Sequence, residues 1–342
     1  MKTYSHIEEL ESFINSLFTC SSSLKQPNNI EMVEKIYQLV TSRKFRKTAI
    51  DSVTEEDLKS KIRFALAKNA PICFSIPFGA YKNWRIPSSN LPDWSEIFCL
   101  SYLTKYVFPI ASIYEPGISF NFSYSSGLMG MVSNMPDEVQ TNYVKQFLKI
   151  LSIVNSFIPK NIKFKLIDIS KSYYSNELEI EFRNNFEYNL KNWELKYSKE
   201  VREKKIQSAK NNFQINGKEN YSDLSPEQLE VKIKESAMFC DAVDCLDKRR
   251  KFNKGGKNIQ LVFVRGPFKS LHIGSSNISS KHFWVSMGVL EKRGDRLLTN
   301  MISHKQIKDE RYYNKIKYFK VDSPFKGLVS NYDSIGIYFD KL

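Results

Sequence analysis

The stretch between residues 71 and 127 constrains the fold most, because it holds two short apolar segments separated by a helical pattern. Residues 71–76 are mostly apolar and are followed by turn-forming residues, which is typical of a short buried strand. Residues 92–110 begin with proline and acidic residues, which are favoured in the first turn of a helix. Residues 118–124 alternate like a second strand. The order strand, turn, helix, turn, strand is typical of an α/β sheet.

The turn after the first of these strands is the best candidate for a site. Open α/β sheets bind their ligands in loops that follow strand ends. Arginine and lysine suit phosphate or carboxylate groups, and tyrosine, asparagine and serine supply neutral hydrogen bonds. The candidate residues in this loop are Tyr81, Lys82, Asn83, Arg85 and Ser88.

Helical and strand patterns alternate along much of the remaining chain. Helices are expected at 6–18, 30–43, 54–68 and 136–159, and strands at 162–169, 259–264, 282–290 and 334–339. Thr54 is the expected N-cap of the third of these helices. Asp168, at a strand end, is either a site residue or a helix cap. This alternation predicts an α/β fold with a mostly parallel sheet flanked by helices.

The composition changes at about residue 174, where the chain becomes rich in charged residues at helical spacing. The basic run at 199–210 is typical of a solvated helix face, and anion or nucleic-acid binding is the alternative. The basic cluster at 248–251 complements the C-terminal end of a helix. We expect one catalytic domain, with a helical layer at 1–70, an α/β core at 71–173 and 257–342, and a charged helical insertion at 174–256.

The net charge favours an anionic partner. The chain of 342 residues has 51 Lys and Arg against 37 Asp and Glu, a formal charge of +14. Such a charge suits a phosphorylated metabolite, a nucleic acid or an acidic membrane surface, and a coding bias toward lysine explains it equally well. Five cysteines without a disulfide framework favour a reducing cytoplasm. No apolar run has the roughly 20 residues of a membrane span, so we expect a cytoplasmic protein that does not associate with membranes.

Familiar cofactor and metal signatures are missing from the sequence. There is no GxxxxGK[ST], GxGxxG or HExxH motif, and no GxSxG motif. Cys240 and Cys245 lie five residues apart on a predicted helix without a second ligand pair, so we interpret them as structural. The four histidines are scattered. We therefore predict neither a metal nor a cofactor.

A second loop repeats the pattern of cations after a buried strand. Arg265 follows the strand expected at 259–264, and Lys269 and His272 come soon after. Each of these cations alone is readily explained as a solvated residue of a basic protein. The occurrence of two such loops, each after a buried strand, favours a role in binding anionic groups.

The order of residues between 71 and 127 resembles the isonitrile (isocyanide) synthase family. That family has a proline turn with lysine and asparagine, a PD-x-(A/S)-E helix start, an IYPPGA segment and a Ser-Asp-Gly turn. The matching positions are Pro77, Lys82, Asn83, Pro92, Asp93, Glu96, Ile113, Tyr114, Pro116, Gly117, Ser126 and Gly127. The resemblance covers about 60 residues, and the later strands fit it more loosely.

The resemblance implies a Rossmann-like fold and an enzyme of secondary metabolism that needs no metal. Members of the family convert the amino group of an amino acid into an isonitrile, with ribulose 5-phosphate as the carbon source. Formation of an imine between the two substrates requires general acid–base catalysis, and the implied catalytic residues are Lys82, Glu96 and His272. The implied substrate-binding residues are Tyr81, Asn83, Arg85, Asp93, Arg265, Lys269 and His282.

The sequence departs from the family pattern at three places. Residues 265–267 are Arg-Gly-Pro where the family tends to have His-Pro, residues 282–284 carry His and Trp in another order, and residues 125–127 are Ser-Ser-Gly. Two alternatives therefore stay open. One is a nucleic-acid-binding protein, directed to tRNA, that uses the basic segments at 199–210 and 248–251. The other is a non-catalytic relative that binds a phosphorylated metabolite.

Overall fold

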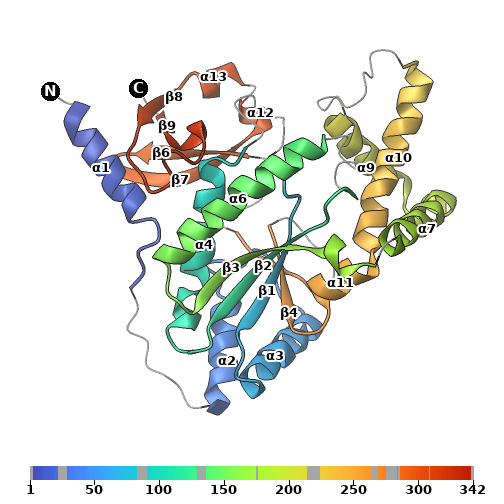
Figure 1. Ribbon diagram of the computed structural model, residues 1–342, viewed down its shortest axis with the longest axis horizontal. Helices are drawn as coiled ribbons and strands as arrows, with labels where there is room; N and C mark the ends of the chain where they lie inside the picture. The colour runs from blue at the N-terminus through green and yellow to red at the C-terminus, as the bar shows by residue number, and fades with distance from the viewer. Residues whose placement is uncertain are drawn as a thin grey trace.

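The computed structural model shows two sheets linked by helices (Figure 1). The second sheet and α1 (Thr3–Asn15) lie at one end of the molecule, and the charged helices lie at the other. The structure describes residues 3–21, 29–82, 91–128, 136–174, 176–213, 224–263, 269–274, 283, 286–307 and 309–339.

The first sheet is parallel throughout. Its strands are β1 (Ile72–Pro77), β2 (Ile118–Tyr124), β3 (Ile162–Asp168), β4 (Asn258–Val262) and β5 (Leu271–His272). The strand order is β3-β2-β1-β4-β5, so the chain first builds outward from β1 on one side and then returns to its other side. The order therefore reverses between β1 and β4, the place where open α/β sheets bind ligands. The predicted Rossmann-like α/β fold is confirmed.

One face of the first sheet is an aromatic core. Phe74, Phe120 and Phe164 stack across three neighbouring strands, with ring centroids 5.3 and 5.0 Å apart. Two helices cover this face, α4 (Trp94–Ala111) through Tyr106 and α6 (Asp137–Phe157) through rings of its own. The helices α2 (Asn29–Val40) and α3 (Ser52–Ala67) join the same core. Burial of these rings is the main source of stability here.

The opposite face of the first sheet is polar. Successive strand residues point to opposite faces, so the strand register places Ser75 beside Asn121 and Gln260, and Asn258 two residues along. We call these four residues the polar face. The helix α11 (Asp247–Lys254) packs on it, where Asn253 contacts both Ser75 and Ser123. The polar face is therefore covered through hydrogen bonds, whereas the aromatic face is covered through ring packing.

The second sheet contains β6 (Ser286–Arg293), β7 (Arg296–Ser303), β8 (Ile316–Lys320) and β9 (Ser334–Phe339). Its order is β7-β6-β9-β8, with β6 and β9 parallel and the two outer pairs antiparallel. Two short helices, α12 (His304–Ile307) and α13 (Glu310–Tyr313), and the 3-10 turn η4 (Ser330–Tyr332) complete this part. The sequence predicted β9, and it predicted β6 with a start four residues too early. It did not predict β7, β8 or a separate second sheet.

The charged segment is helical, as predicted. It follows the turn η1 (Ile169–Ser172) and contains α7 (Glu177–Lys191), α8 (Trp193–Lys196), α9 (Lys199–Phe213) and α10 (Pro226–Cys245). On α9, the exposed Lys204 pairs with the exposed Glu200, which fits the solvated-face interpretation, whereas Lys205 pairs with the buried Asp241 of α10. Ser225 is the N-cap of α10, and its hydroxyl accepts the Gln228 backbone N–H. Within the described residues, no helix is both long and apolar enough to cross a membrane.

Three helix ends bear on local predictions made from the sequence. The N-cap of α3 is Asp51, not Thr54, because the Asp51 carboxylate accepts the Thr54 backbone N–H at 2.7 Å. The basic cluster at 248–251 does not end a helix: α10 stops at Cys245, and the cluster lies in the early turns of α11. Asp168 is the N-cap of η1, as the capping alternative predicted.

Candidate active site

The first turn of α4 holds two buried carboxylates in fixed positions. Asp93 is the N-cap and accepts the Ser95 backbone N–H at 2.7 Å, while Glu96 Oε2 accepts the Asp93 N–H at 2.7 Å. This reciprocal capping box also places both acids at the positive end of the helix. The helix start expected from the sequence is thereby confirmed.

Lys82 comes to these carboxylates from the end of β1. After β1 the chain turns through Ala80, whose φ of 56° is left-handed and strained for a residue with a Cβ. The Lys82 side chain is fully buried, and its ammonium lies 3.0 Å from Asp93 Oδ1, 2.6 Å from Ser95 Oγ and 3.0 Å from both Glu96 oxygens. Its donors are therefore directed at protein acceptors.

Tyr143 of α6 completes this group. Its hydroxyl donates to Glu96 Oε1 at 2.9 Å, and its ring is fully buried. Burial raises the pKa of Tyr143 well above its ordinary value, so the phenol stays protonated. We call Lys82, Asp93, Ser95, Glu96 and Tyr143 the buried ionic cluster.

Glu96 is the titratable centre of the buried ionic cluster. Desolvation raises the pKa of Glu96 to about 7, although Lys82 lowers it, and Asp93 raises it further. Asp93 Oδ2 is buried without a hydrogen-bond partner among the described contacts. A carboxyl that changes protonation near neutral pH is suited to general acid–base chemistry.

The raised pKa of Glu96 predicts that the protein loses stability as pH rises. The folded state holds this proton more tightly than the unfolded state, where the pKa is near 4.5. Its stabilising contribution is therefore complete below about pH 4.5 and is lost as pH passes about 7. Relative to Glu96→Gln, the free energy of unfolding of the wild type should fall across this window, by at most about 1.4 kcal/mol per pH unit.

Chemical denaturation at several pH values measures this difference. Glu55→Gln is the matched control, because Lys59 lowers the pKa of Glu55 and the sign of the pH dependence is reversed. Parallel pH profiles for the wild type and Glu96→Gln would contradict the assignment of Glu96 as the titrating group.

The buried ionic cluster also joins the two sheets. The Phe283 carbonyl accepts from Lys82 Nζ at 3.1 Å and from Ser95 Oγ at 2.8 Å. The Gly288 N–H of β6 donates to Asp93 Oδ1 at 3.3 Å, and the Tyr332 hydroxyl donates to the Asp93 carbonyl at 3.1 Å. The position of α4 is thus set by the second sheet as well as by the first.

The other predicted catalytic residue lies elsewhere on the first sheet. His272 is on β5, two strands from β1 or roughly 10 Å away. Its Nε2 is 2.9 Å from the Phe263 carbonyl, and its Nδ1 is buried without a hydrogen-bond partner among the described contacts. Lys269 precedes the same strand, with Nζ 3.9 Å from Asp57 Oδ1. Neither of these two contacts involves the buried ionic cluster.

The remaining predicted substrate-binding residues are only partly described. Tyr81 is half-buried against the core, next to Lys82. Phe283, whose carbonyl contacts Lys82, directly follows His282. The predicted residues Asn83, Arg85, Arg265 and His282 lie outside the described residues, as does Ser88.

Sequence reasoning missed a second polar group at the carboxyl ends of the strands. Arg249 of α11 is largely buried, and its Nη1 donates to Ser125 Oγ, just beyond β2, at 3.2 Å. One turn later on α11, Asn253 Oδ1 accepts from Ser123 Oγ at 2.6 Å. We call Ser123, Ser125, Arg249 and Asn253 the Arg249 group. The spacing of Arg249 and Asn253 by four residues was the available signal, since it places both on one helix face.

Two residues of the family resemblance shape the amino edge of the sheet instead. The Tyr114 hydroxyl donates to the Ala70 carbonyl at 2.7 Å, and Gly117 has a left-handed φ of 70°. A Cβ at Gly117 would lie 1.9 Å from the Asn161 carbonyl oxygen. The contacts of Tyr114 and Gly117 therefore support the fold at this edge of the sheet.

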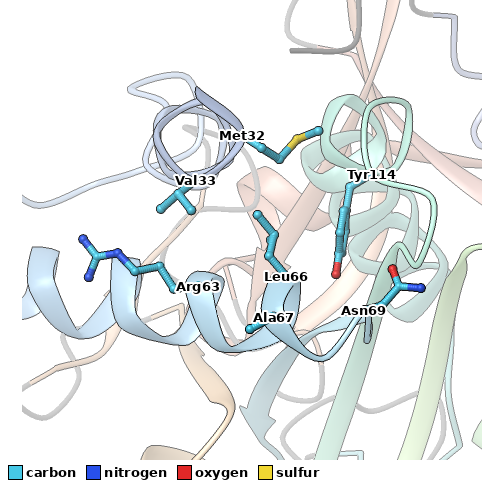
Figure 2. Close-up of a pocket in the computed structure, with 7 residues that line it drawn as sticks. All are labelled: Met32, Val33, Arg63, Leu66, Ala67, Asn69 and Tyr114. Carbon is cyan, nitrogen blue, oxygen red and sulfur yellow. The ribbon is translucent and has the colours of Figure 1, made fainter. Parts of the chain in front are cut away.

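A cavity of about 430 Å³ adjoins Tyr114 (Figure 2). Figure 2 shows it between α2 and α3, lined by Met32, Val33, Arg63, Leu66, Ala67, Asn69 and Tyr114. Arg63, the cation on its rim, pairs with the exposed Glu56 at 2.7 Å. None of the predicted site residues lines this cavity.

Comparison with known proteins agrees with the fold described above. No protein-family model and no curated protein matches the sequence. Among solved structures, the PvcA protein from Pseudomonas aeruginosa is similar, with a TM-score of 0.56 and 14% identity over 90% of this chain and 99% of that chain. The two proteins share a fold.

Two further structures are more distant. A CDPS from Fluoribacter dumoffii has a TM-score of 0.32 and 13% identity over 66% of this chain and 85% of that chain. Tyrosyl-tRNA synthetase from Aeropyrum pernix has a TM-score of 0.30 and 11% identity over 67% of this chain and 52% of that chain.

The described site offers proton transfer and anion binding. In the described residues, no three His, Cys, Asp or Glu side chains converge as metal ligands, and metal independence stays a prediction. Glu96 can exchange a proton near neutral pH, and Arg249 is a permanent cation at the carboxyl edge. Glu96 contacts Lys82, which follows β1, and Arg249 contacts Ser125, which follows β2.

Proposed function

We propose that this chain is a divergent isonitrile-synthase-like enzyme that acts on an amino acid and a sugar phosphate such as ribulose 5-phosphate. One observation carries the proposal. Lys82, Asp93 and Glu96, matched one by one in the sequence resemblance, converge in a single buried cluster although they are 11 and 14 residues apart. The capping box alone explains why the two acids are neighbours, so the approach of the buried Lys82 to both of them is the part that supports the resemblance.

The fold supports the same assignment. The isonitrile-synthase-type fold extends over nearly the whole length of PvcA and most of this chain. The reversal of strand order beside β1 puts the buried ionic cluster next to the usual ligand position of such sheets. The basic character of the chain suits a phosphorylated substrate without a nucleotide motif.

In this proposal Glu96 moves protons and Lys82 positions it. An imine between the amino group and the sugar ketone requires a proton to be taken from nitrogen and given to oxygen. Glu96, with a pKa raised to about 7 and Tyr143 as its hydrogen-bond donor, is the group suited to that exchange. The Lys82 ammonium is already surrounded by carboxylates, so its role is to hold them in place rather than to bind phosphate.

A substrate screen tests the proposal. The purified protein is incubated with ribulose 5-phosphate and each aromatic and aliphatic amino acid, and thermal shift and mass spectrometry are recorded. We expect the sugar phosphate to raise the melting temperature and one amino acid to be converted to its isonitrile. The absence of both effects with every amino acid would overturn the proposal.

A further inference from the structure

The helix α7 lies at one end of the molecule and buries only one of its faces (Figure 1). Its inner face packs on α10, where Phe182 and Phe186 stack on Phe239 with ring centroids 5.3 and 4.4 Å apart. Its outer face carries Ile180 and Tyr188, which are 57% and 64% exposed. Large apolar side chains gathered on one surface indicate an interaction site, whereas single ones are ordinary.

The outer face of α7 is symmetric about Asn184. Ile180 and Tyr188 lie four residues before and after it, which puts them on the same side of the helix. Glu177 and Lys191 lie seven residues before and after it, again on that side. An acid therefore marks one end of the face and a base the other, with an apolar group next to each. We call Glu177, Ile180, Asn184, Tyr188 and Lys191 the α7 stripe.

Two copies of the α7 stripe fit each other when they run antiparallel. Asn184 then meets Asn184 of the second copy on the two-fold axis, and Ile180 of each copy meets Tyr188 of the other. Glu177 of each copy meets Lys191 of the other, so opposite charges face each other at both ends. A two-fold dimer requires a surface that is complementary to itself in this way. A parallel arrangement would bring like charges together.

The two ends of the surface continue the same symmetry. Tyr174, just before α7, is 82% exposed, and Leu195 of α8 is 88% exposed. These are the highest fractions among the large apolar side chains that the structure describes. Because Tyr174 lies ten residues before Asn184 and Leu195 eleven residues after it, the antiparallel arrangement brings Tyr174 of each copy close to Leu195 of the other. The shared surface is then roughly 30 Å long at the rise of a helix.

A groove beside the acidic half of the α7 stripe gives the second copy a place to bind. Its volume is about 640 Å³, and it is lined by side chains between residues 174 and 184 and by Asp247. The Glu177 carboxylate in this groove accepts from Lys248 at 2.7 Å. Glu181 accepts the Asp247 N–H at 2.6 Å. A carboxylate has about four acceptor sites, so these internal contacts leave positions for the Lys191 ammonium of a second copy.

We propose that α7 forms the interface of a two-fold dimer, in which Tyr188 of each copy enters the groove beside Ile180 of the other. The apolar contacts supply most of the affinity, and the pairs between Glu177 and Lys191 set the antiparallel register, because exposed ion pairs add little energy but select orientation. An interface of this length is at the small end of stable ones, so we expect a dissociation constant on the order of 10 µM. The dimer is independent of the proposed function.

Sedimentation velocity of the full chain between about 1 and 200 µM tests the dimer, and the mass of the wild type should double across this range. We expect Tyr188→Glu to weaken dimerisation at least about 30-fold, because it puts an acid against Ile180 in both halves of the interface. Lys191→Glu should weaken it about 10-fold by placing two acids together. The control Lys145→Glu makes the same change of charge at an exposed position of α6 and should stay within about twofold.

Glu177→Lys combined with Lys191→Glu separates the proposed pairing from a general effect of charge. This double variant restores opposite charges across the antiparallel helices, so it should dimerise within about threefold of the wild type. A wild type that stays monomeric over the whole range, or a dimer that Tyr188→Glu leaves unchanged, would refute the interface. A double variant no better than Lys191→Glu would refute the antiparallel register. A monomer that instead binds a different protein through α7 would also refute the dimer.

Discussion

Lys82→Met is expected to lower the free energy of unfolding by about 3–5 kcal/mol, the cost of removing one partner from a buried ion pair. The methionine fills similar volume, but it leaves Asp93 and Glu96 in the interior without their cation. Because the pKa of Glu96 is already raised, protonation of this carboxyl should make the loss smaller at low pH. Urea denaturation at pH 5 and pH 8 measures both effects.

The expectation rests on burial, and a surface pair is the fitting control. Lys204 makes an ion pair with Glu200 on an exposed helix face, so Lys204→Met should cost less than about 1 kcal/mol. The double variant Lys82→Met with Glu96→Gln should lose less than the sum of the single changes, because the glutamine needs no cation. A loss below 1 kcal/mol for Lys82→Met would be inconsistent with the buried ionic cluster.

Gly288→Ala is expected to cost about 3 kcal/mol, the upper part of the usual range for overpacking. A Cβ at this position of β6 would lie 2.2 Å from the Ser95 backbone nitrogen and 2.4 Å from the Trp94 carbonyl carbon. Both atoms are backbone in the first turn of α4, so the clash can be relieved only by moving that turn. Thermal and chemical denaturation measure the loss of stability.

The same substitution should also impair the site, because the turn that must move contains the carboxylates. Gly294→Ala, in the turn between β6 and β7, is the control. Its φ of 57° is left-handed but nothing lies within 4 Å of the new Cβ, so only backbone strain of about 1–2 kcal/mol is expected. Equal costs for Gly288→Ala and Gly294→Ala would show that α4 does not approach β6 as closely as described.

Local signals in the sequence predicted four of the five strands of the first sheet, all but β5, and one half of the site. The apolar run ending at Pro77 and the alternation before Tyr124 are β1 and β2, and Asp93 with Glu96 forms the helix start that the PDWSE segment indicated. These features depend on neighbours within a few residues, which is why periodicity and capping rules detect them.

Long-range packing determined what the sequence did not predict. A lysine gives no sequence signal of burial, and Lys82 is buried because carboxylates from α4 and a carbonyl from residue 283 surround it. In the sequence, Arg249 is one of four consecutive basic residues, and only the packing of α11 on the polar face shows that its side chain is buried. The strands β7 and β8 are largely half-exposed and carry weak apolar patterns, so the second sheet was not recognised.

Isotope transfer at pH 7 is the most direct test of the proposed enzyme. The substrates are ¹³C-labelled ribulose 5-phosphate and the ¹⁵N-labelled amino acid identified by the screen, and the product is analysed by mass spectrometry. We predict a product that keeps ¹⁵N and gains one ¹³C carbon, and a turnover about 100- to 10,000-fold lower in Glu96→Gln, the range for loss of a general acid–base group. A product without ¹³C, or full turnover in Glu96→Gln, would contradict the account.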